Sequence, residues 1–311
     1  DDVSVGCVEA SKATCSGILQ LTEALRNSGV RSLECGLQVI TRDAISLPAT
    51  DGESVAGVDP RQTGYWGFGS VIAAERPTYR CRVVDVPNSE MEQTEASAAV
   101  IAELLLTETL ENQFAIRNAH LLVPRLVSAR SELSRGPSSD QAFQASSEHS
   151  YLITGGLGML GRYAAMWLAQ QGAGQVVLVS RRRPDEAALD FVDAIREIGC
   201  DVVVHSADVS IRADMESLFA QFSNELYPLG GIIHAAGVLD DGQIESQTWE
   251  RFEKVLAPKA TAAEWLDELS RSHDPEFFVL YSSVASVLGS PGQSNYATAN
   301  AFLDRLEVEL R

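Results

Sequence analysis

The sequence has 311 residues, with 43 acidic and 24 basic side chains, so its formal net charge at pH 7 is −19. This charge argues against nucleic-acid binding, because the chain lacks a basic field that would attract phosphates. At the usual size of roughly 100–200 residues per domain, two domains are expected. The five cysteines are scattered and form no CxxC pair. We therefore predict no metal site and no disulfide framework, and a reducing, cytoplasmic location.

One long uncharged stretch raises the question of a membrane span. Residues 277–303 contain no charged side chain, but Ser, Gly, Gln and Asn occur throughout and Pro291 lies in the middle. A membrane helix needs about 20 predominantly apolar residues. The stretch therefore predicts a buried strand, a loop and the start of a helix. The acidic first four residues do not resemble a signal peptide, so no membrane partner is expected.

The first half of the chain alternates between helical and strand patterns. Helices are predicted at residues 13–27, 63–74 and 96–105, and strands at residues 37–41, 80–86 and 119–127. Such alternation is typical of a parallel α/β layer. No catalytic motif occurs in this half. Residues 131–150 are rich in Ser, Gln and Gly and predict a linker, which places a domain boundary between residues 148 and 149.

The second half shows the same alternation more clearly. Strands are predicted at residues 151–154, 175–180, 201–206, 230–234 and 277–282. Helices are predicted at residues 158–171, 185–198, 212–225 and 249–270. This order is that of a doubly wound, nucleotide-binding sheet.

A glycine-rich turn follows the first strand of this second half. It reads Gly156-Leu157-Gly158-Met159-Leu160-Gly161. A GxGxxG motif between a strand and a helix lets the backbone approach a pyrophosphate, and the helix N-terminus attracts the negative charge. A glycine turn without a ligand is the alternative, which the surrounding strand–helix–strand pattern disfavours.

The end of the next strand selects the form of the cofactor. Ser180 is followed by Arg181-Arg182-Arg183, and no acidic residue occurs before Asp185. NAD-binding sheets carry an Asp or Glu here for the ribose 2′-hydroxyl, whereas a guanidinium suits the 2′-phosphate of NADPH. NADPH is therefore favoured over NADH, with a solvated basic turn as the alternative.

Two further strand ends contribute candidates. Ala207-Asp208-Val209 follows the third strand, where Asp208 either accepts from the adenine amino group or caps the next helix. The small residues Ala235-Ala236-Gly237 follow the fourth strand, where the nicotinamide ribose would pass. His234 is predicted to be a core histidine rather than a catalyst.

Hydroxyl and amide side chains follow the last strand. Ser283 lies directly after it, and Tyr296 and Asn300 are four residues apart, so they share one face of a helix. A Tyr beside a Ser hydroxyl and a cation can protonate a ketone as hydride arrives. The chain has three lysines to supply the cation, and they are Lys12, Lys254 and Lys259.

These motifs resemble the ketoreductase domain of modular type I polyketide synthases, within the short-chain dehydrogenase/reductase superfamily. The matching stretches are residues 154–161, 234–241 and 281–300. In the first half, residues 64–69 and 75–77 are similar to the family's structural subdomain, which has lost its cofactor site. The resemblance implies an α/β fold with two Rossmann-like subdomains: a degenerate structural one over residues 1–148 and a catalytic one, a doubly wound parallel sheet that binds NADPH, over residues 149–311.

The resemblance also implies the roles of individual residues. Most short-chain dehydrogenases carry Lys four residues after the Tyr. In this family Asn stands there and Lys comes earlier, which implies the catalytic residues Lys259, Ser283, Tyr296 and Asn300. The cofactor-binding residues implied are Thr154, Gly155, Gly156, Leu157, Gly158, Met159, Leu160, Gly161, Ser180, Arg181, Ala207, Asp208, Val209, Ala235, Ala236 and Gly237.

The stereochemical type is implied by three substrate-orienting residues. Leu239-Asp240-Asp241 resembles the marker of B-type ketoreductases, which form the D alcohol. Leu288 stands where A-type domains have a tryptophan, eight residues before the Tyr. Without the resemblance, the Asp pair would be a solvated turn. The implied orienting residues are Leu239, Asp241 and Leu288.

The expected activity is NADPH-dependent reduction of a β-ketoacyl thioester to a D-β-hydroxyacyl thioester. The expected partners are an acyl carrier protein, which presents the substrate on its phosphopantetheine arm, and neighbouring synthase domains. A redox-silent domain that serves as an epimerase or scaffold is an alternative. A free-standing dehydrogenase for a small alcohol is another, which the catalytically silent first half and the Asn-for-Lys exchange disfavour.

Overall fold

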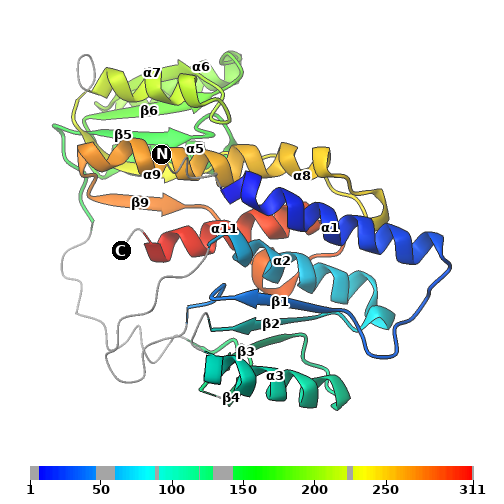
Figure 1. The fold of residues 1–311 in the computed structure, drawn as a ribbon. Helices are drawn as coiled ribbons and strands as arrows, with labels where there is room; N and C mark the ends of the chain where they lie inside the picture. Colours follow the sequence, from blue (N-terminus) through cyan, green and yellow to red (C-terminus); the bar gives the residue numbers. More distant parts are fainter. Residues whose placement is uncertain are drawn as a thin grey trace. The chain divides into compact units, whose positions relative to one another are not determined.

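The chain folds into two compact units that are interleaved in sequence. The computed structural model describes residues 7–46, 60–87, 91–118, 120–128, 143–222 and 227–309 (Figure 1). Unit 1 comprises Asp1–Pro124, Val238–Thr261 and Ser282–Arg311, and unit 2 comprises Arg125–Gly237 and Ala262–Tyr281. The last 30 residues therefore belong with the first half of the chain rather than with the strand that precedes them. The predicted domain boundary between residues 148 and 149 stays a prediction.

Unit 1 contains a four-stranded sheet. Its strands are β1 (Gln38–Arg42), β2 (Arg82–Val86), β3 (Gln113–Arg117) and β4 (His120–Leu122), in the order β1-β2-β3-β4. The first three are parallel and β4 is antiparallel to β3. The helices of its first half are α1 (Cys7–Asn27), α2 (Pro60–Glu75) and α3 (Met91–Leu106). The expected parallel α/β layer is confirmed, except that β3 was not predicted and the strand expected at 119–127 is the short β4.

The carboxyl ends of β1 and β2 are crosslinked by a buried carboxylate. Asp85 is fully buried and accepts hydrogen bonds from the Thr41 hydroxyl at 2.7 Å and from the Ala44 N–H at 2.8 Å. An Arg117 guanidinium nitrogen lies 2.6 Å from its other oxygen. A buried carboxylate needs such partners. Doubly wound sheets bind nucleotides at this edge. In unit 1 the Asp85 carboxylate at this edge is instead bonded to Thr41, Ala44 and Arg117 of the protein itself.

The rest of unit 1 comes from the later segments of the chain. These contain α8 (Trp249–Leu256), a π-helical turn (Ala257–Thr261), α10 (Ala285–Leu288) and α11 (Ser294–Glu309). Helix α11 packs directly on α2, as Figure 1 shows. A Cβ built on Gly67 of α2 would lie 2.4 Å from the Ala297 carbonyl oxygen of α11. The two helices can approach this closely only because position 67 has no side chain.

Unit 2 is a five-stranded parallel sheet. Its strands are β5 (Ser150–Thr154), β6 (Gln175–Ser180), β7 (Asp201–Ser206), β8 (Leu229–His234) and β9 (Phe277–Leu280), in the order β7-β6-β5-β8-β9. The helices are α5 (Met159–Gln170), α6 (Glu186–Glu197), α7 (Arg212–Phe222) and α9 (Ala262–Ser270). The predicted doubly wound order is confirmed.

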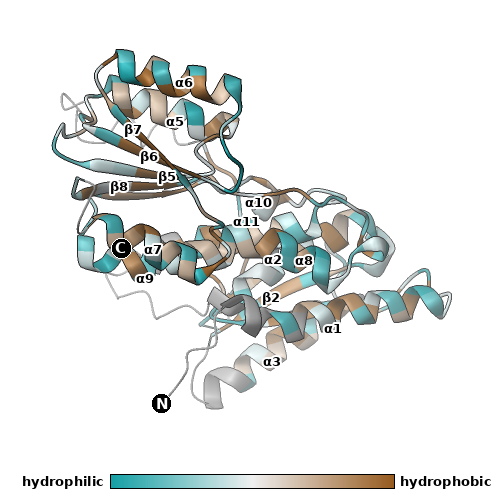
Figure 2. Ribbon diagram, turned by 90° about the horizontal axis from the view of Figure 1, so that it is seen from above, coloured by the Kyte–Doolittle hydropathy of each residue, from teal (hydrophilic) through white to brown (hydrophobic). Residues whose placement is uncertain are grey.

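Side chains of the central strands form two apolar layers, one on each face of the sheet. Ile153 and Leu178 pack with α5 and α6, whereas their neighbours Leu152 and Val177 pack with α7 and α9. This division follows from the two-residue period of a strand. Figure 2 shows the matching pattern on α6, whose hydrophobic and hydrophilic residues form alternating bands. A sheet buried on both faces explains the continuous apolar runs of the sequence.

Two expectations about unit 2 are wrong in part. Strand β9 is half-buried rather than buried, because it forms an edge of the described sheet, and it ends at Leu280. The predicted linker at 131–150 lies outside the described residues up to 142. Its last part is packed: the Phe143 ring stacks on Trp167 with centroids 5.0 Å apart, and Ser150 begins β5.

The contact between α2 and α11 predicts the effect of adding one methyl group. Gly67→Ala should destabilise the chain by about 1–3 kcal/mol, because the new methyl group meets backbone atoms that have no room to move. Urea unfolding measures this change. Gly17→Ala in α1 is the matched control, since a Cβ there meets nothing within 4 Å, and it should be neutral or stabilise by up to about 1 kcal/mol. Equal effects of the two substitutions would contradict the close packing.

Candidate active site

The glycine turn of unit 2 joins β5 to α5. Gly155 has a φ of +66°, and a Cβ on it would lie 2.8 Å from the Ala235 carbonyl oxygen. A Cβ on Gly161 would lie 2.4 Å from the Gly155 carbonyl oxygen. Gly158 precedes the helix and offers no capping side chain, and Met159 at the helix start is 73% exposed. A tight, uncapped helix start of this kind fits a pyrophosphate.

The ends of β5 and β8 are joined beside this turn. The Thr154 hydroxyl lies 2.6 Å from Nδ1 of His234, and the Ala236 N–H donates to the same hydroxyl at 3.3 Å. The Ala235 N–H donates to the Thr154 carbonyl oxygen at 3.1 Å. His234 is fully buried, as expected of a core histidine. These bonds place the small residues 235–237 next to the glycine turn.

The ends of β6 and β7 bring Arg181 and Asp208 together. Nη1 of Arg181 lies 3.8 Å from Oδ2 of Asp208, and the Arg181 side chain is 54% exposed. Oδ1 of Asp208 accepts from the Ser210 N–H at 2.9 Å, so this carboxylate also shapes the turn before α7. Both interpretations of Asp208 therefore stay open. Its neighbours Ala207 and Val209 are buried in the core beneath α7.

The four predicted catalytic residues all lie in unit 1. Lys259 occupies the π-helical turn, is 5% exposed, and has its Nζ 5.4 Å from the centroid of the Tyr296 ring. Burial lowers the pKa of the Lys259 ammonium from 10.5 to about 8, and the carboxylate of Asp304 opposes this shift. Short π-helical segments are often found at functional sites. The structure thus selects Lys259 among the three lysines as the cation next to Tyr296.

Asn300 lies one turn after Tyr296 on α11. Its Nδ2 donates to the Tyr296 carbonyl oxygen at 2.8 Å, and its Oδ1 is buried without a hydrogen-bond partner in the described part of the chain. A buried acceptor without a partner is costly. The arrangement therefore fits a water or a ligand donor at Oδ1.

Ser283 begins the turn that leads into α10. Its Oγ accepts from the Ala285 N–H at 3.2 Å, and its carbonyl oxygen lies 2.7 Å from the Ser286 hydroxyl. Ala285 and Ala297 share an apolar cluster that packs against Tyr296. The turn carrying Ser283 and the helix carrying Tyr296 are therefore held by one small core.

The loop with the predicted orienting residues is fixed by α8. Nε of Arg251 lies 2.8 Å from Oδ1 of Asp240, and Nζ of Lys254 lies 2.8 Å from Oδ2. Hydrogen bonds from Lys254 and Arg251 lower the pKa of the Asp240 carboxyl. Leu239 is 61% exposed, and Asp241 accepts from the Gln293 amide at 3.1 Å. Asp240 thus anchors the loop and leaves Leu239 exposed beside it.

Sequence reasoning missed two residues that position this loop. Asn295 donates from Nδ2 to the Asp240 carbonyl oxygen at 2.8 Å, which ties the loop to the start of α11. Arg251 also donates to the Asp241 carbonyl oxygen at 2.8 Å. The position of Asn295 directly before Tyr296 could have indicated from the sequence that Asn295 matters. The sequence around Arg251 gives no such indication, since an arginine on a helix is usually solvated.

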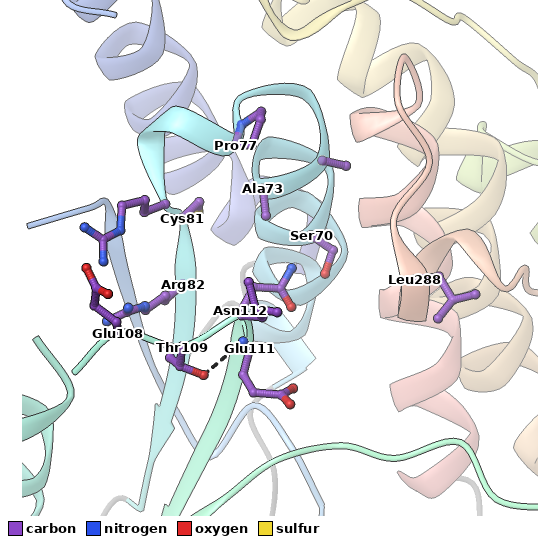
Figure 3. A pocket seen from close by; sticks show the side chains of 13 residues that line it. Ser70, Ala73, Pro77, Cys81, Arg82, Glu108, Thr109, Glu111, Asn112 and Leu288 are labelled. Carbon is purple, nitrogen blue, oxygen red and sulfur yellow. Dashed lines mark hydrogen bonds between the residues drawn. The ribbon is translucent and has the colours of Figure 1, made fainter. Parts of the chain in front are cut away.

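Leu288 is the last residue of α10. It is 58% exposed and lines a cavity of about 590 Å³, together with residues of α2, β2 and residues 108–112. Figure 3 shows Leu288 on one side of this cavity and Ser70, Arg82 and Glu111 on the other. None of the four predicted catalytic residues lines it. Leu288 and the predicted catalytic residues therefore do not share this cavity.

Comparison with known proteins identifies the family. The KR domain family matches residues 149–311, and the family described as "Polyketide synthase extender module SpnB, Rossmann fold domain" matches residues 3–126. Polyketide synthase GfsA of Streptomyces halstedii is 38% identical over 294 residues, which are 94% of this chain and 4% of that protein. Erythronolide synthase EryA3 of Saccharopolyspora erythraea is 35% identical over 288 residues, 92% of this chain and 8% of that protein. The chain thus spans less than a tenth of these relatives.

Solved structures share the whole fold. An A1-type ketoreductase superposes with a TM-score of 0.79 at 33% identity, over 93% of this chain and 58% of that one. A C2-type ketoreductase from a modular polyketide synthase superposes with a TM-score of 0.76 at 28% sequence identity, over 94% of this chain and 60% of that one. A ketoreductase domain from the bacillaene assembly line superposes with a TM-score of 0.78 at 26% sequence identity, over 100% of this chain and 69% of that one.

The doubly wound sheet and its glycine turn define a fold of the short-chain dehydrogenase/reductase type, whose ketoreductases use a nicotinamide cofactor. Within that class, the chain belongs to the ketoreductase domains of modular polyketide synthases, and it is an oxidoreductase domain of secondary metabolism. Among the residues that the structure describes, no helix is long and apolar enough to span a bilayer. No group of three His, Cys, Asp or Glu side chains in those same ranges could hold a metal ion.

The buried ammonium of Lys259 predicts a pH dependence. Its pKa of about 8 lies below the ordinary 10.5, so the charge is lost as the pH rises through 8. If Tyr296 needs this cation, kcat/KM should fall above about pH 8. In Lys259→Arg the guanidinium stays charged, so any remaining activity should lack this decline.

Stability provides a readout that does not depend on activity. Between pH 8 and 10.5 the unfolded chain binds more protons at Lys259 than the folded chain, so the free energy of unfolding should rise with pH. Lys259→Met should remove this rise. An identical pH dependence of stability in both proteins would contradict the burial of the charge.

Proposed function

We propose that this domain uses NADPH to reduce the β-keto group of a polyketide intermediate bound to an acyl carrier protein, and that the product is a D-β-hydroxyacyl thioester. The main support is the packing of the Lys259 ammonium against the Tyr296 ring, in a chain of the ketoreductase family. The carrier protein and the neighbouring synthase domains belong to the proposal, because the chain spans only part of its relatives. A redox-silent epimerase or scaffold would not need the complete set of reducing residues.

The proposed proton donor is the Tyr296 hydroxyl. Protonation of the ketone oxygen leaves a phenolate, which a nearby cation stabilises. Lys259 is the described cation at the ring. The Ser283 hydroxyl would donate to the same ketone oxygen and orient it. Asn300 would hold, at its buried Oδ1, the water that returns a proton to the site.

The cofactor would supply the hydride, and unit 2 offers the residues to hold it. Gly155 and Gly161 allow the turn to pack closely, since Cβ atoms there would meet the backbone of residues 235–236 and 155–156. The uncapped start of α5 would then face the pyrophosphate. The exposed Arg181 guanidinium would bind the 2′-phosphate, and Asp208 the adenine amino group. Thr154 fixes the strand ends beside the nicotinamide ribose position through its bond with His234.

The D configuration is supported by loop residues and not by the fold. An A1-type and a C2-type ketoreductase superpose with similar TM-scores of 0.79 and 0.76, so the overall likeness does not discriminate between types. Leu239 is exposed on a loop that Asp240 anchors, and position 288 carries a leucine rather than a tryptophan. These residues would guide the pantetheine arm from the side that yields the D alcohol.

Tyr296→Phe tests the proposed chemistry. The variant should lose about 10²–10⁴-fold in the rate of β-ketoacyl reduction, because only the acidic proton is removed. NADPH binding, measured by fluorescence, should stay within about twofold of the parent, since no cofactor-holding residue changes. Tyr227→Phe is the matched control, because this tyrosine is 41% exposed. A near-normal rate in the Tyr296 variant would refute its role.

Arg181→Ala tests the choice of cofactor. A charge-assisted hydrogen bond is worth roughly 1.5–3 kcal/mol, so NADPH affinity should drop about 10- to 150-fold, whereas NADH affinity should change little. Titration calorimetry with both cofactors measures this difference. Arg196→Ala on α6, which removes a guanidinium paired with Asp193, is the control. Equal losses for both cofactors would reject the 2′-phosphate contact.

A further inference from the structure

We propose that Glu75, at the end of α2, is a positioning residue that clamps two loops, one with the predicted substrate-orienting residues Leu239 and Asp241 and one that leads into the helix of Tyr296. The inference rests on the proposed function and adds a residue to it. The first of these loops comprises residues 239–246 and is called the Asp loop. The second comprises residues 289–293, between α10 and α11, and is called the glycine loop.

Both carboxylate oxygens of Glu75 are engaged, one by each loop. Oε2 accepts from the Ile244 N–H at 2.8 Å, and Oε1 accepts from the Gly292 N–H at 2.7 Å. The loops also contact each other, because the Gly242 N–H donates to the Gly292 carbonyl oxygen at 2.7 Å. Hydrogen bonds to an ionised acceptor are among the stronger ones in proteins. Glu75 thus joins segments that lie 169 and 217 residues further along the chain.

The next residue reinforces the clamp on the Asp loop. The Arg76 guanidinium forms an ion pair with Glu245, and both side chains are partly buried, at 33% and 19% exposure. Glu75, the last residue of α2, and Arg76, which follows it, therefore hold consecutive residues of the loop. Partial burial reduces solvent screening, so this pair should hold the loop more firmly than an exposed pair would.

The Asp loop carries the predicted orienting residues Leu239 and Asp241, and the glycine loop leads into α11, the helix of Tyr296. Asp241 of the Asp loop accepts from the Gln293 amide of the glycine loop at 3.1 Å. Three residues after Gln293 comes Tyr296. Because Glu75 fixes both loops, it fixes the distance between the loop bearing Leu239 and the start of the helix that bears the proton donor. That distance should govern which face of the ketone is presented.

A carboxylate is the only side chain of this size that suits both contacts. Glutamine could accept through its one oxygen, but its amide nitrogen would then face the second N–H group, donor against donor. Helix α2, which ends at Glu75, also packs closely against α11 at Gly67. Helix α2 thus supports Tyr296 along its length and the orienting loops at its end.

The experiment compares Glu75→Gln and Glu75→Ala with Glu95→Gln, a substitution of an exposed glutamate on α3. The substrate is a β-ketoacyl group on an acyl carrier protein, and the readouts are kcat/KM, the D:L ratio of the product by chiral chromatography and the NADPH dissociation constant. Displacements of about 1 Å can cost about 10²-fold in rate. Both Glu75 variants should lose about that factor in kcat/KM and yield more L alcohol. NADPH affinity should stay within about twofold.

The D:L ratio separates positioning from simple destabilisation. A lower folded fraction reduces the rate but leaves the ratio of the remaining turnover unchanged, so a lower rate with the parent ratio would overturn the proposal. A second set of variants tests the neighbouring ion pair. Arg76→Glu and Glu245→Arg should each lower the D excess, and the double reversal should restore it. No restoration would count against the clamp.

The clamp can also be tested apart from the reaction. Amide hydrogen exchange at Ile244 and Gly292 should accelerate by at least about tenfold in Glu75→Ala, whereas it should not change in Glu95→Gln. If the parent domain reduced no β-ketoacyl thioester, the proposed function would fail, but this exchange would still report the clamp. Unchanged exchange at both amides would overturn the inference even in an active enzyme.

Discussion

The close contact between α2 and α11 is the constraint on which the position of the proposed catalytic residue Tyr296 depends. Gly67 has no side chain, and the backbone of Ala297 occupies the space where one would lie. The next residue along α11, after Tyr296 and Ala297, is Thr298, whose Cγ2 would lie 2.9 Å from a Cβ on Gly64. A helix seated this closely has little freedom to slide or rotate. The first half of the chain, which carries no catalytic motif, thereby sets the place of the tyrosine.

The side chains proposed for catalysis and for cofactor binding come from different compact units. Lys259, Ser283, Tyr296 and Asn300 belong to unit 1, and the glycine turn, Arg181 and Asp208 belong to unit 2. Within unit 1, the ammonium of Lys259 is buried at the Tyr296 ring. A desolvated cation interacts more strongly with a developing phenolate than an exposed one does. The burial that lowers the pKa of this ammonium to about 8 would thus also strengthen its proposed effect on Tyr296 below that pH.

Sequence patterns predicted the elements better than their grouping. The apolar runs and the glycine turn predicted the five strands of unit 2, because parallel strands are buried on both faces. The short strand β3 was not predicted, and of the strand expected at residues 119–127 only His120–Leu122 is described as a strand. That residues 282–311 belong with the first half could not be predicted, since it depends on two glycines of α2 meeting α11. The same holds for Glu75, whose partners lie 169 and 217 residues away.

Isotope tracing can follow the proposed hydride transfer from the cofactor to the β-carbon of the substrate. The domain would be incubated with a carrier-bound β-ketoacyl substrate and NADPH that carries deuterium at both C4 positions. We expect a β-hydroxyacyl product one mass unit heavier than the product formed with unlabelled NADPH, with the deuterium on the β-carbon and one NADPH oxidised per product. Exchange of the α-hydrogen with solvent, without NADPH oxidation or β-deuteration, would contradict the proposed reduction and indicate a redox-silent epimerase.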